Sequence, residues 1–181
     1  VYSQFEQEEY LTEEDGRISV KVAPEQGYSI YADYANALTH VYQGLAGSGD
    51  FDLQSIFLDE ASLDSFYAYR GITREPGTGV VIASLQDPEY NPITGGIVEL
   101  SSSDQEPFVL NGQSIPLAGN EILSGYKSFV FFPNVPSGTA TLSHSAPYGD
   151  LCYSVPRGSN GEDLEIEVFG NSLNIAMLHC E

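Results

Sequence analysis

Short apolar segments that alternate with polar residues recur along most of this chain, and clusters of Gly, Pro, Asn and Ser separate them. In RISVKV the apolar residues Ile18, Val20 and Val22 alternate with Arg17, Ser19 and Lys21. Successive side chains of a β-strand point to opposite faces, so this alternation predicts half-buried strands. Many short strands with turn signals between them predict an all-β sandwich or barrel.

The same pattern predicts further strands beyond the Pro24–Gly27 turn. In chain order they are GYSIYA, GDFDLQSIFLD, GVVIASL, GIVEL, KSFVFF, TATLS, LCYSV, LEIEVF and LNIAML. GVVIASL is continuously apolar, which is typical of a central strand. In FFPNVPSGTATL we expect a strand to end at Pro133, a turn at Gly138, and a new strand with Ala140 and Leu142 facing inward.

One segment has helical spacing instead. Leu63, Phe66, Tyr67 and Arg70 follow each other at i, i+3, i+4 and i+7. Ser62 is placed to cap the N-terminus and Gly71 to end the helix in a left-handed conformation. We predict one short helix near 63–70 that packs on a sheet.

Pro and Gly gather in REPGTG, from Arg74 to Gly79, directly before the central strand. This segment is the best candidate for a boundary between two units. The expected organisation is a first β unit at residues 1–73, which ends in the helix, and a second at 74–181.

The charge balance excludes several classes of partner. Six Lys and Arg oppose 26 Asp and Glu among 181 residues, which gives a formal net charge of −20. Such a chain repels phosphate backbones and anionic lipid, so nucleic-acid binding and membrane-surface binding are disfavoured. The sequence contains no apolar run near the ~20 residues that cross a bilayer, so no membrane insertion is expected.

The two cysteines, Cys152 and Cys180, both fall in strand-like segments. Two half-buried cysteines on neighbouring strands are a candidate disulfide, and a disulfide favours an extracellular or cell-surface location. Free buried cysteine is the alternative. Zinc is not expected, because no CxxC or HxxxH spacing occurs.

No catalytic constellation stands out, and we expect no enzyme. His144 has Ser143 and Ser145 beside it, but neighbours on a strand face opposite ways. The many carboxylates include Glu165 and Glu167, which we expect to point at solvent, and nothing sets a glycosidase pair across a cleft.

Calcium is the one cofactor that the residues suggest, because hard cations take several oxygen ligands from turns. The weak candidates are Glu13, Asp15, Asp87 and Glu89. Solvated acidic turns explain the same residues, and neither turn matches an EF-hand loop. We therefore expect no firm metal site.

Tyrosine is abundant, with 12 residues in the chain. Tyr28, Tyr31, Tyr34 and Tyr42 cluster in the first unit. Tyrosine is enriched at protein interfaces, and it is equally an ordinary strand residue. These four side chains are the candidate interaction residues.

Two stretches resemble the carboxypeptidase regulatory-like domain, a transthyretin-like, Greek-key β-sandwich. TGVVIASLQDPEYNPITGGIVEL is similar to the family's first two strands, and FVFFPNVPSGTATLSH is similar to its later x-V-P-x-G-x-Y-x-L signature. The resemblance covers Thr78 to Ser145. It departs from the family at Gly96, where Ala is usual, and at Ala140, where a large residue is usual.

The first unit resembles the middle of the same family, in TEEDGRISVKVAPEQGYSIYADY. Only VYSQFEQEEYL precedes it, which is enough for one strand at most. Either the chain is a fragment, or the first unit is a smaller sheet on the second, or another subunit supplies a strand by β-strand addition.

The favoured function is therefore non-enzymatic: an extracellular structural or interaction protein whose partners are other protein subunits. The more specific version of this hypothesis is that the protein is a subunit of a surface filament or larger assembly. The alternatives are an accessory carbohydrate-binding or substrate-positioning module of a secreted enzyme, and a calcium-stabilised adhesin.

Overall fold

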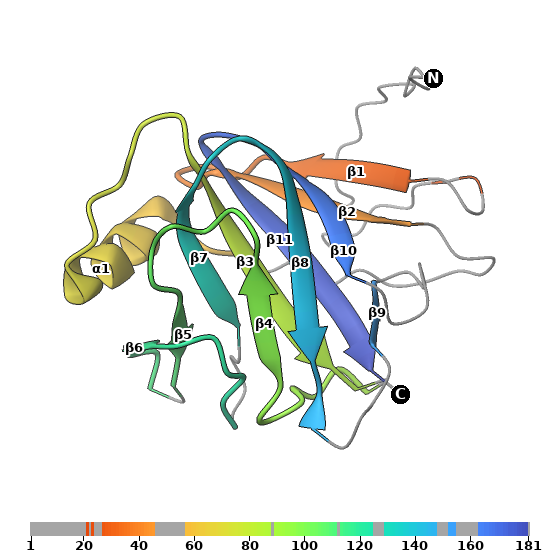
Figure 1. Cartoon of the computed structure of the whole chain (residues 1–181). Helices are drawn as coiled ribbons and strands as arrows, with labels where there is room; N and C mark the ends of the chain where they lie inside the picture. The colour runs from red at the N-terminus through yellow and green to blue at the C-terminus, as the bar shows by residue number, and fades with distance from the viewer. Residues whose placement is uncertain are drawn as a thin grey trace.

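The computed structural model describes residues 21, 23, 27–45, 57–87, 89–111, 113–124, 129–147, 152–154 and 163–180. Within them the chain forms an all-β sandwich with one short helix, which confirms the predicted fold class (Figure 1). Two sheets form the layers, and the helix covers the outer face of the larger sheet.

The larger sheet has eight strands, and the smaller has three. The larger runs in the order β1 (Gly27–Ala32), β2 (Thr39–Leu45), β11 (Ser172–Cys180), β3 (Gly79–Gln86), β7 (Val130–Val135), β5 (Phe108–Leu110) and β6 (Pro116–Ala118), with β9 (Cys152–Ser154) beside β11. The smaller runs β10 (Leu164–Val168), β8 (Gly138–Ser145) and β4 (Ile97–Leu100). The helix is α1 (Glu60–Arg70).

The core has two compartments, one on each face of the larger sheet. Alternate residues of β3 divide between them: Val81 and Leu85 pack against the smaller sheet, and Val80 and Ile82 pack toward α1. A strand that is buried on both faces needs apolar residues at every position. This explains why GVVIASL lacks alternation, and it confirms the central place predicted for this segment.

β11 is the strand that joins the N-terminal strands to the rest of the sheet. It pairs in parallel with β3 along one edge, from Leu173 opposite Val80 to His179 opposite Gln86. Its other edge pairs in parallel with β2 and, farther on, antiparallel with β9. The first predicted unit therefore contributes β1 and β2 to the sheet of the second. The division at residue 73 stays a prediction.

α1 packs as predicted but begins earlier. Its N-cap is Asp59, whose Oδ1 accepts the Ser62 backbone N–H at 2.7 Å, so Ser62 lies inside the helix. The cap prediction was wrong because a carboxylate one turn upstream is the stronger acceptor at the positive end of the helix dipole. Gly71 ends the helix at φ +68°, as expected. Leu63 and Tyr67 are buried against the sheet.

Several strands differ from the prediction. The strands β2, β5 and β6 were not predicted, because their sequences show no clear alternation of apolar and polar residues. Lys21, in the predicted strand RISVKV, is exposed and lies outside any strand, and the rest of that segment is outside the described residues. Most of GDFDLQSIFLD is also outside them, and Phe57 and Leu58 are not in a strand.

The stretch FFPNVPSGTATL is an arch between the two sheets, and its first strand does not end at Pro133. β7 runs on to Val135 through a β-bulge, at which the β3–β7 register shifts between Gly79–Val135 and Val81–Phe132. Asn134 occupies the bulge with φ +51°. The chain then crosses into the smaller sheet, where Ala140 and Leu142 face the core as predicted.

Three asparagine side chains hold the turns at this end of the sandwich. Asn134 accepts the Glu75 N–H at 3.1 Å and donates to the Thr73 carbonyl at 2.7 Å. Asn171 accepts from Gly77, and the buried Asn174 bonds both the N–H and the carbonyl of Phe169. The amides satisfy backbone groups that no strand pairs here.

Gly79 sits against this cluster with no room for a side chain. A Cβ there would lie 2.5 Å from the Phe169 carbonyl oxygen and 2.7 Å from Asn174 Nδ2. Gly77 nearby has open space around the same position, but its φ is +82°.

We therefore predict that Gly79→Ala lowers the free energy of unfolding by roughly 1–3 kcal/mol through overpacking. Gly77→Ala is the matched control, and it should lose only about 1 kcal/mol, the cost of a left-handed backbone for a residue with a Cβ. Urea unfolding of both variants measures the difference. An equal or larger loss for Gly77→Ala would contradict the tight packing at Gly79.

Candidate functional site

β1 is the outermost strand of the larger sheet, and its sequence GYSIYA contains no charged residue and no proline. It pairs with β2 from Gly27–Leu45 to Ala32–His40. On its far side the described part of the chain supplies no strand. Natural sheets protect such edges with charge, proline, bulges or covering loops, and β1 has none of the first three.

At one residue of the β10 edge, Glu167, the side chain of Gln43 from β2 contacts the backbone. Its Nε2 donates to the Glu167 carbonyl at 2.5 Å, and its Oε1 accepts the Glu167 N–H at 2.9 Å. One amide thus occupies both backbone groups of Glu167 and links the two sheets. We call this pair of hydrogen bonds the Gln43 clamp.

The remaining edges are covered or short. Along β4, the Val98 N–H donates to the Asn120 carbonyl at 3.0 Å, and Ile122 bonds back to Gly96 at 2.7 Å. β6 has three residues and begins with Pro116, which has no N–H to offer. β9 also has only three residues. Among the described strands, β1 is therefore the long edge without a visible cover.

Tyr31 stands on the exposed face of β1. Its side chain is 52% exposed, and its ring meets Phe169 edge to face at 5.5 Å. Partial burial raises the pKa of the Tyr31 hydroxyl, and the Glu167 carboxylate raises it further. Both effects favour the protonated form of the Tyr31 hydroxyl.

The four candidate tyrosines separate into two pairs. Tyr28 and Tyr42 are 7% and 3% exposed, and Tyr42 lies in the core beneath α1, so neither is a surface contact in this structure. The alternation of β1 turns Tyr28 inward and Tyr31 outward. Tyr34 is half-buried beside His40 and Phe57. An interaction role for Tyr31 and Tyr34 stays a prediction.

His40 is a buried, neutral structural residue. The Leu58 N–H donates to its Nε2 at 3.3 Å, so the proton is on Nδ1, which donates to the Leu38 carbonyl at 2.8 Å. Burial lowers the pKa of His40 below its ordinary value of 6.5, against the opposing effect of the Leu38 hydrogen bond. A second proton would remove the acceptor that Leu58 needs.

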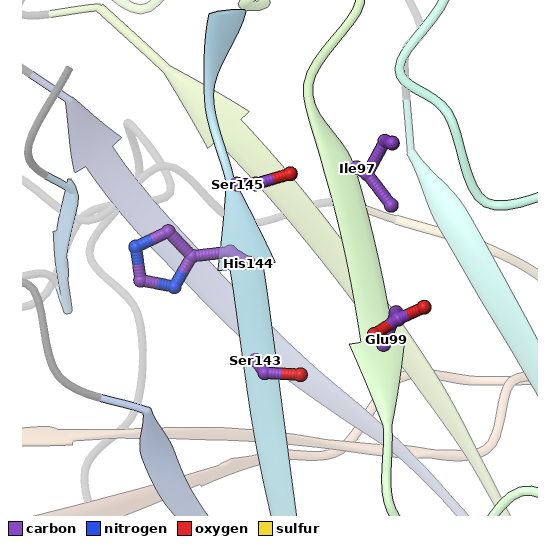
Figure 2. Close-up of a pocket in the computed structure, with 5 residues that line it drawn as sticks. All are labelled: Ile97, Glu99, Ser143, His144 and Ser145. Atoms are coloured by element: carbon purple, nitrogen blue, oxygen red, sulfur yellow. The ribbon is translucent and has the colours of Figure 1, made fainter. Parts of the chain in front are cut away.

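The pocket on the smaller sheet does not build a catalytic site. It has a volume of about 130 Å³ and is lined by Ile97, Glu99, Ser143, His144 and Ser145 (Figure 2). The His144 ring points to the opposite side of β8 from both serines. Its Nδ1 is buried without a hydrogen-bond partner, so neither serine is activated through that nitrogen.

The carboxylates of the described residues are placed as structural or solvated groups. Asp87 Oδ1 accepts the backbone N–H groups of Glu89 and Asn91 at 2.9 and 2.8 Å, and Oδ2 accepts the Asn91 amide at 2.9 Å. The Asn91 side chain holds the pKa of Asp87 below its usual value. Glu165 and Glu167 are exposed on β10, as predicted.

These carboxylates do not form a cluster of ligands that would support the calcium hypothesis. In the described part of the chain, no three histidine, cysteine or acidic residues gather as metal ligands do. Asp87 holds its own turn together by accepting N–H groups of Glu89 and Asn91. Glu13 and Asp15 are outside the described residues, so calcium binding stays a prediction.

Cys152 and Cys180 form the disulfide that the sequence suggested. They lie directly opposite each other in the β9–β11 ladder and are 0% and 3% exposed. The bond ties β9 to the end of β11. Among the helices of the described residues, none is long and apolar enough to cross a membrane.

No protein-family model matches this chain, and no curated protein matches it either. The carboxypeptidase regulatory-like assignment therefore stays a resemblance.

Two solved structures show a distant likeness. The group B streptococcus pilus 2b backbone protein is 15% identical with a TM-score of 0.34, covering 60% of this chain and 43% of its own. A streptococcal ancillary pilin is 13% identical with a TM-score of 0.37, covering 87% and 45%. This chain thus spans less than half the length of either. Both likenesses are too remote to bear on function.

Sequence reasoning missed the Gln43 clamp and the exposed position of β1. Gln43 lies in a strand without clear alternation, and nothing local indicates a partner 124 residues away. The sequence did contain a signal for the exposed edge of β1. Apart from the buried strand β3, GYSIYA is the longest described strand that has no charged residue, no proline and no histidine.

The histidines give a testable pH dependence. Burial lowers the pKa of His40, His144 and His179 below 6.5 in the folded chain, so their contribution to stability is fully present above pH 6.5. As the pH falls below that value, the unfolded chain takes up protons that the folded chain does not. We expect the free energy of unfolding to decrease between pH 7 and about pH 5.

Urea unfolding across this range measures the slope. The variant H144Q/H179Q should keep part of the slope, because His40 remains. A flat profile in the native chain would show that burial does not hold the three rings neutral.

Proposed function

We propose that this protein is a non-enzymatic structural subunit that acts outside the cell and joins other protein subunits by β-strand addition at β1. The observation that carries the proposal is the uncharged edge of β1, from Ser29 to Ala32, to which no described strand is added, whereas the Gln43 clamp and the segment Asn120–Ile122 contact the edges of β10 and β4. Backbone N–H and C=O groups on such an edge provide affinity for an added strand.

Other features of the molecule support an assembly role. The described residues bring no nucleophile, base and orienting group together, and their histidines are held neutral by burial. The buried disulfide suits an oxidising compartment. A net charge of −20 makes copies of this chain repel each other and so opposes non-specific association. Specific backbone pairing at the uncharged edge of β1 is the contact that this repulsion affects least.

Assembly at β1 is tested by placing a charge on its edge. We expect Ser29→Lys to reduce large particles in light scattering and electron microscopy several-fold, because an edge lysine opposes strand addition. Ser29 is exposed, so the melting temperature should stay unchanged.

Leu117→Lys is the matched control, because it changes the net charge equally on the short edge strand β6, where Leu117 is 41% exposed. It should assemble like the native chain. A native chain that remains monomeric at all concentrations and salt levels would refute the assembly role itself.

A further inference from the structure

One histidine interrupts the apolar row that β2 presents to α1. Leu38 and Tyr42 belong to the core compartment between the larger sheet and α1. His40 shares the face of Tyr42, because alternate residues of a strand point the same way. Its side chain is 0% exposed, so both ring nitrogens need partners from the protein.

His40 joins the connection between β1 and β2 (residues 33–38) to the segment that leads into α1 (residues 57–59). Nδ1 donates to the Leu38 carbonyl at 2.8 Å, and Nε2 accepts the Leu58 N–H at 3.3 Å. The ring meets Tyr34 edge to face at 4.9 Å and lies nearly parallel to Phe57 at 6.4 Å, both measured between ring centroids. We call this arrangement the His40 latch.

Two backbone contacts hold the same connection to the start of α1. Ala37 and Asp59 form an isolated β-bridge, and the Glu60 N–H donates to the Asn36 carbonyl at 3.1 Å. Backbone amides do not change their protonation in mild acid. Of the described hydrogen bonds between these two segments, the one that His40 accepts is therefore the one that pH can remove.

The elements around His40 do not place a carboxylate on its ring. Its partners in the two neighbouring strands are apolar: Ala32 in β1 and Leu173 in β11. The described titratable side chains of the elements packed around it are Tyr34, Asp33, Asp59 and Glu60. Asp33 and Asp59 accept hydrogen bonds within their own segments, and Glu60 is exposed beside Arg74.

We propose that the His40 latch is a pH-sensitive switch, which releases residues 57–59 and the first turn of α1 from the β1–β2 connection in mildly acidic surroundings. A second proton turns Nε2 from an acceptor into a donor, so two N–H groups face each other at Leu58. The ring then also carries a charge inside an apolar compartment. Local opening relieves both costs, because water reaches the ring.

Burial decides the direction in which pH acts on the latch. It lowers the pKa of His40 while the latch is closed, and in the open form the pKa returns toward its ordinary value of 6.5. The latch is therefore fully stable above pH 6.5, and below it the open form takes up the proton first. Its opening constant rises by at most tenfold per pH unit, or about 30-fold between pH 6.5 and 5.

Amide hydrogen exchange of the full chain, followed by NMR between pH 7 and pH 5, tests the switch. After correction for the intrinsic exchange rate, we expect the protection factors of residues 58–62 to fall by up to about 30-fold. At each pH they should lie well below those of residues 81–85 in β3, because the latch opens while the sandwich stays folded. Equal protection of the two segments would show that only the whole fold opens, and would overturn the proposal.

His40→Gln is the test variant, because a glutamine can accept the Leu58 N–H and does not titrate. Its residues 58–62 should keep constant protection at every pH. His144→Gln is the matched control, because His144 is a half-buried histidine of the smaller sheet. It should lose protection at residues 58–62 like the native chain. A loss in His40→Gln as large as the native one would refute the latch.

The nitrogen-15 shifts of the His40 ring in the native chain give a test that needs no substitution. We expect an unprotonated Nε2 at pH 7, and protonation of the ring that coincides with the loss of protection at residues 58–62. A ring that is fully protonated at pH 5 while those residues stay protected would overturn the proposal. The result does not depend on assembly at β1.

Discussion

The parallel pairing of β11 with β2 and β3 is the interaction on which the rest of this structure depends. β2 has only β1 on its other side, so the two N-terminal strands reach the sandwich through the ladder from Ser172–Thr39 to Ile175–Tyr42. The opposite edge of β11 pairs with β3 over seven positions. The disulfide then holds the end of β11 against β9.

This arrangement makes β1 and β2 part of the same sheet as the later strands. The same solution places β1 at the outside of that sheet. The Gln43 clamp, the segment Asn120–Ile122 and Pro116 protect other edges, and this unequal protection gives the molecule a preferred side for a partner.

The polar groups of the described residues serve the fold. Asn134 and Asn174 satisfy turns at the bulge, Asp87 organises the loop after β3, and His40 bridges two backbone groups in one tautomer. Side chains that could suggest catalysis in the sequence are thereby committed to backbone hydrogen bonds or separated by strand alternation, as His144 is from its neighbouring serines. Buried polar groups of folded proteins are satisfied by hydrogen bonds in this way.

Part of the fold and little of the site could be predicted from the sequence. Alternation identified β1, β8, β10 and β11, and the continuous apolar run identified β3 as central. Helical spacing identified α1 to within three residues of its start. β2, β5 and β6 were missed because short strands without alternation have no local signature. The predicted strand end at Pro133 was wrong, because a β-bulge allows a proline to remain inside a strand.

The sequence by itself determined several strands, among them β1, β3 and β8, one helix, and the large negative charge, because these depend on neighbouring residues alone. Only the tertiary structure decided which strands pair, because Leu173 pairs with Val80, about half the chain away in sequence. It also turned Pro136–Gly138 into an arch, buried Tyr42 and left Tyr31 exposed. Alternation reports that one face of a strand is covered, whereas the partner that covers it, and the edge that stays open, come from contacts distant in sequence.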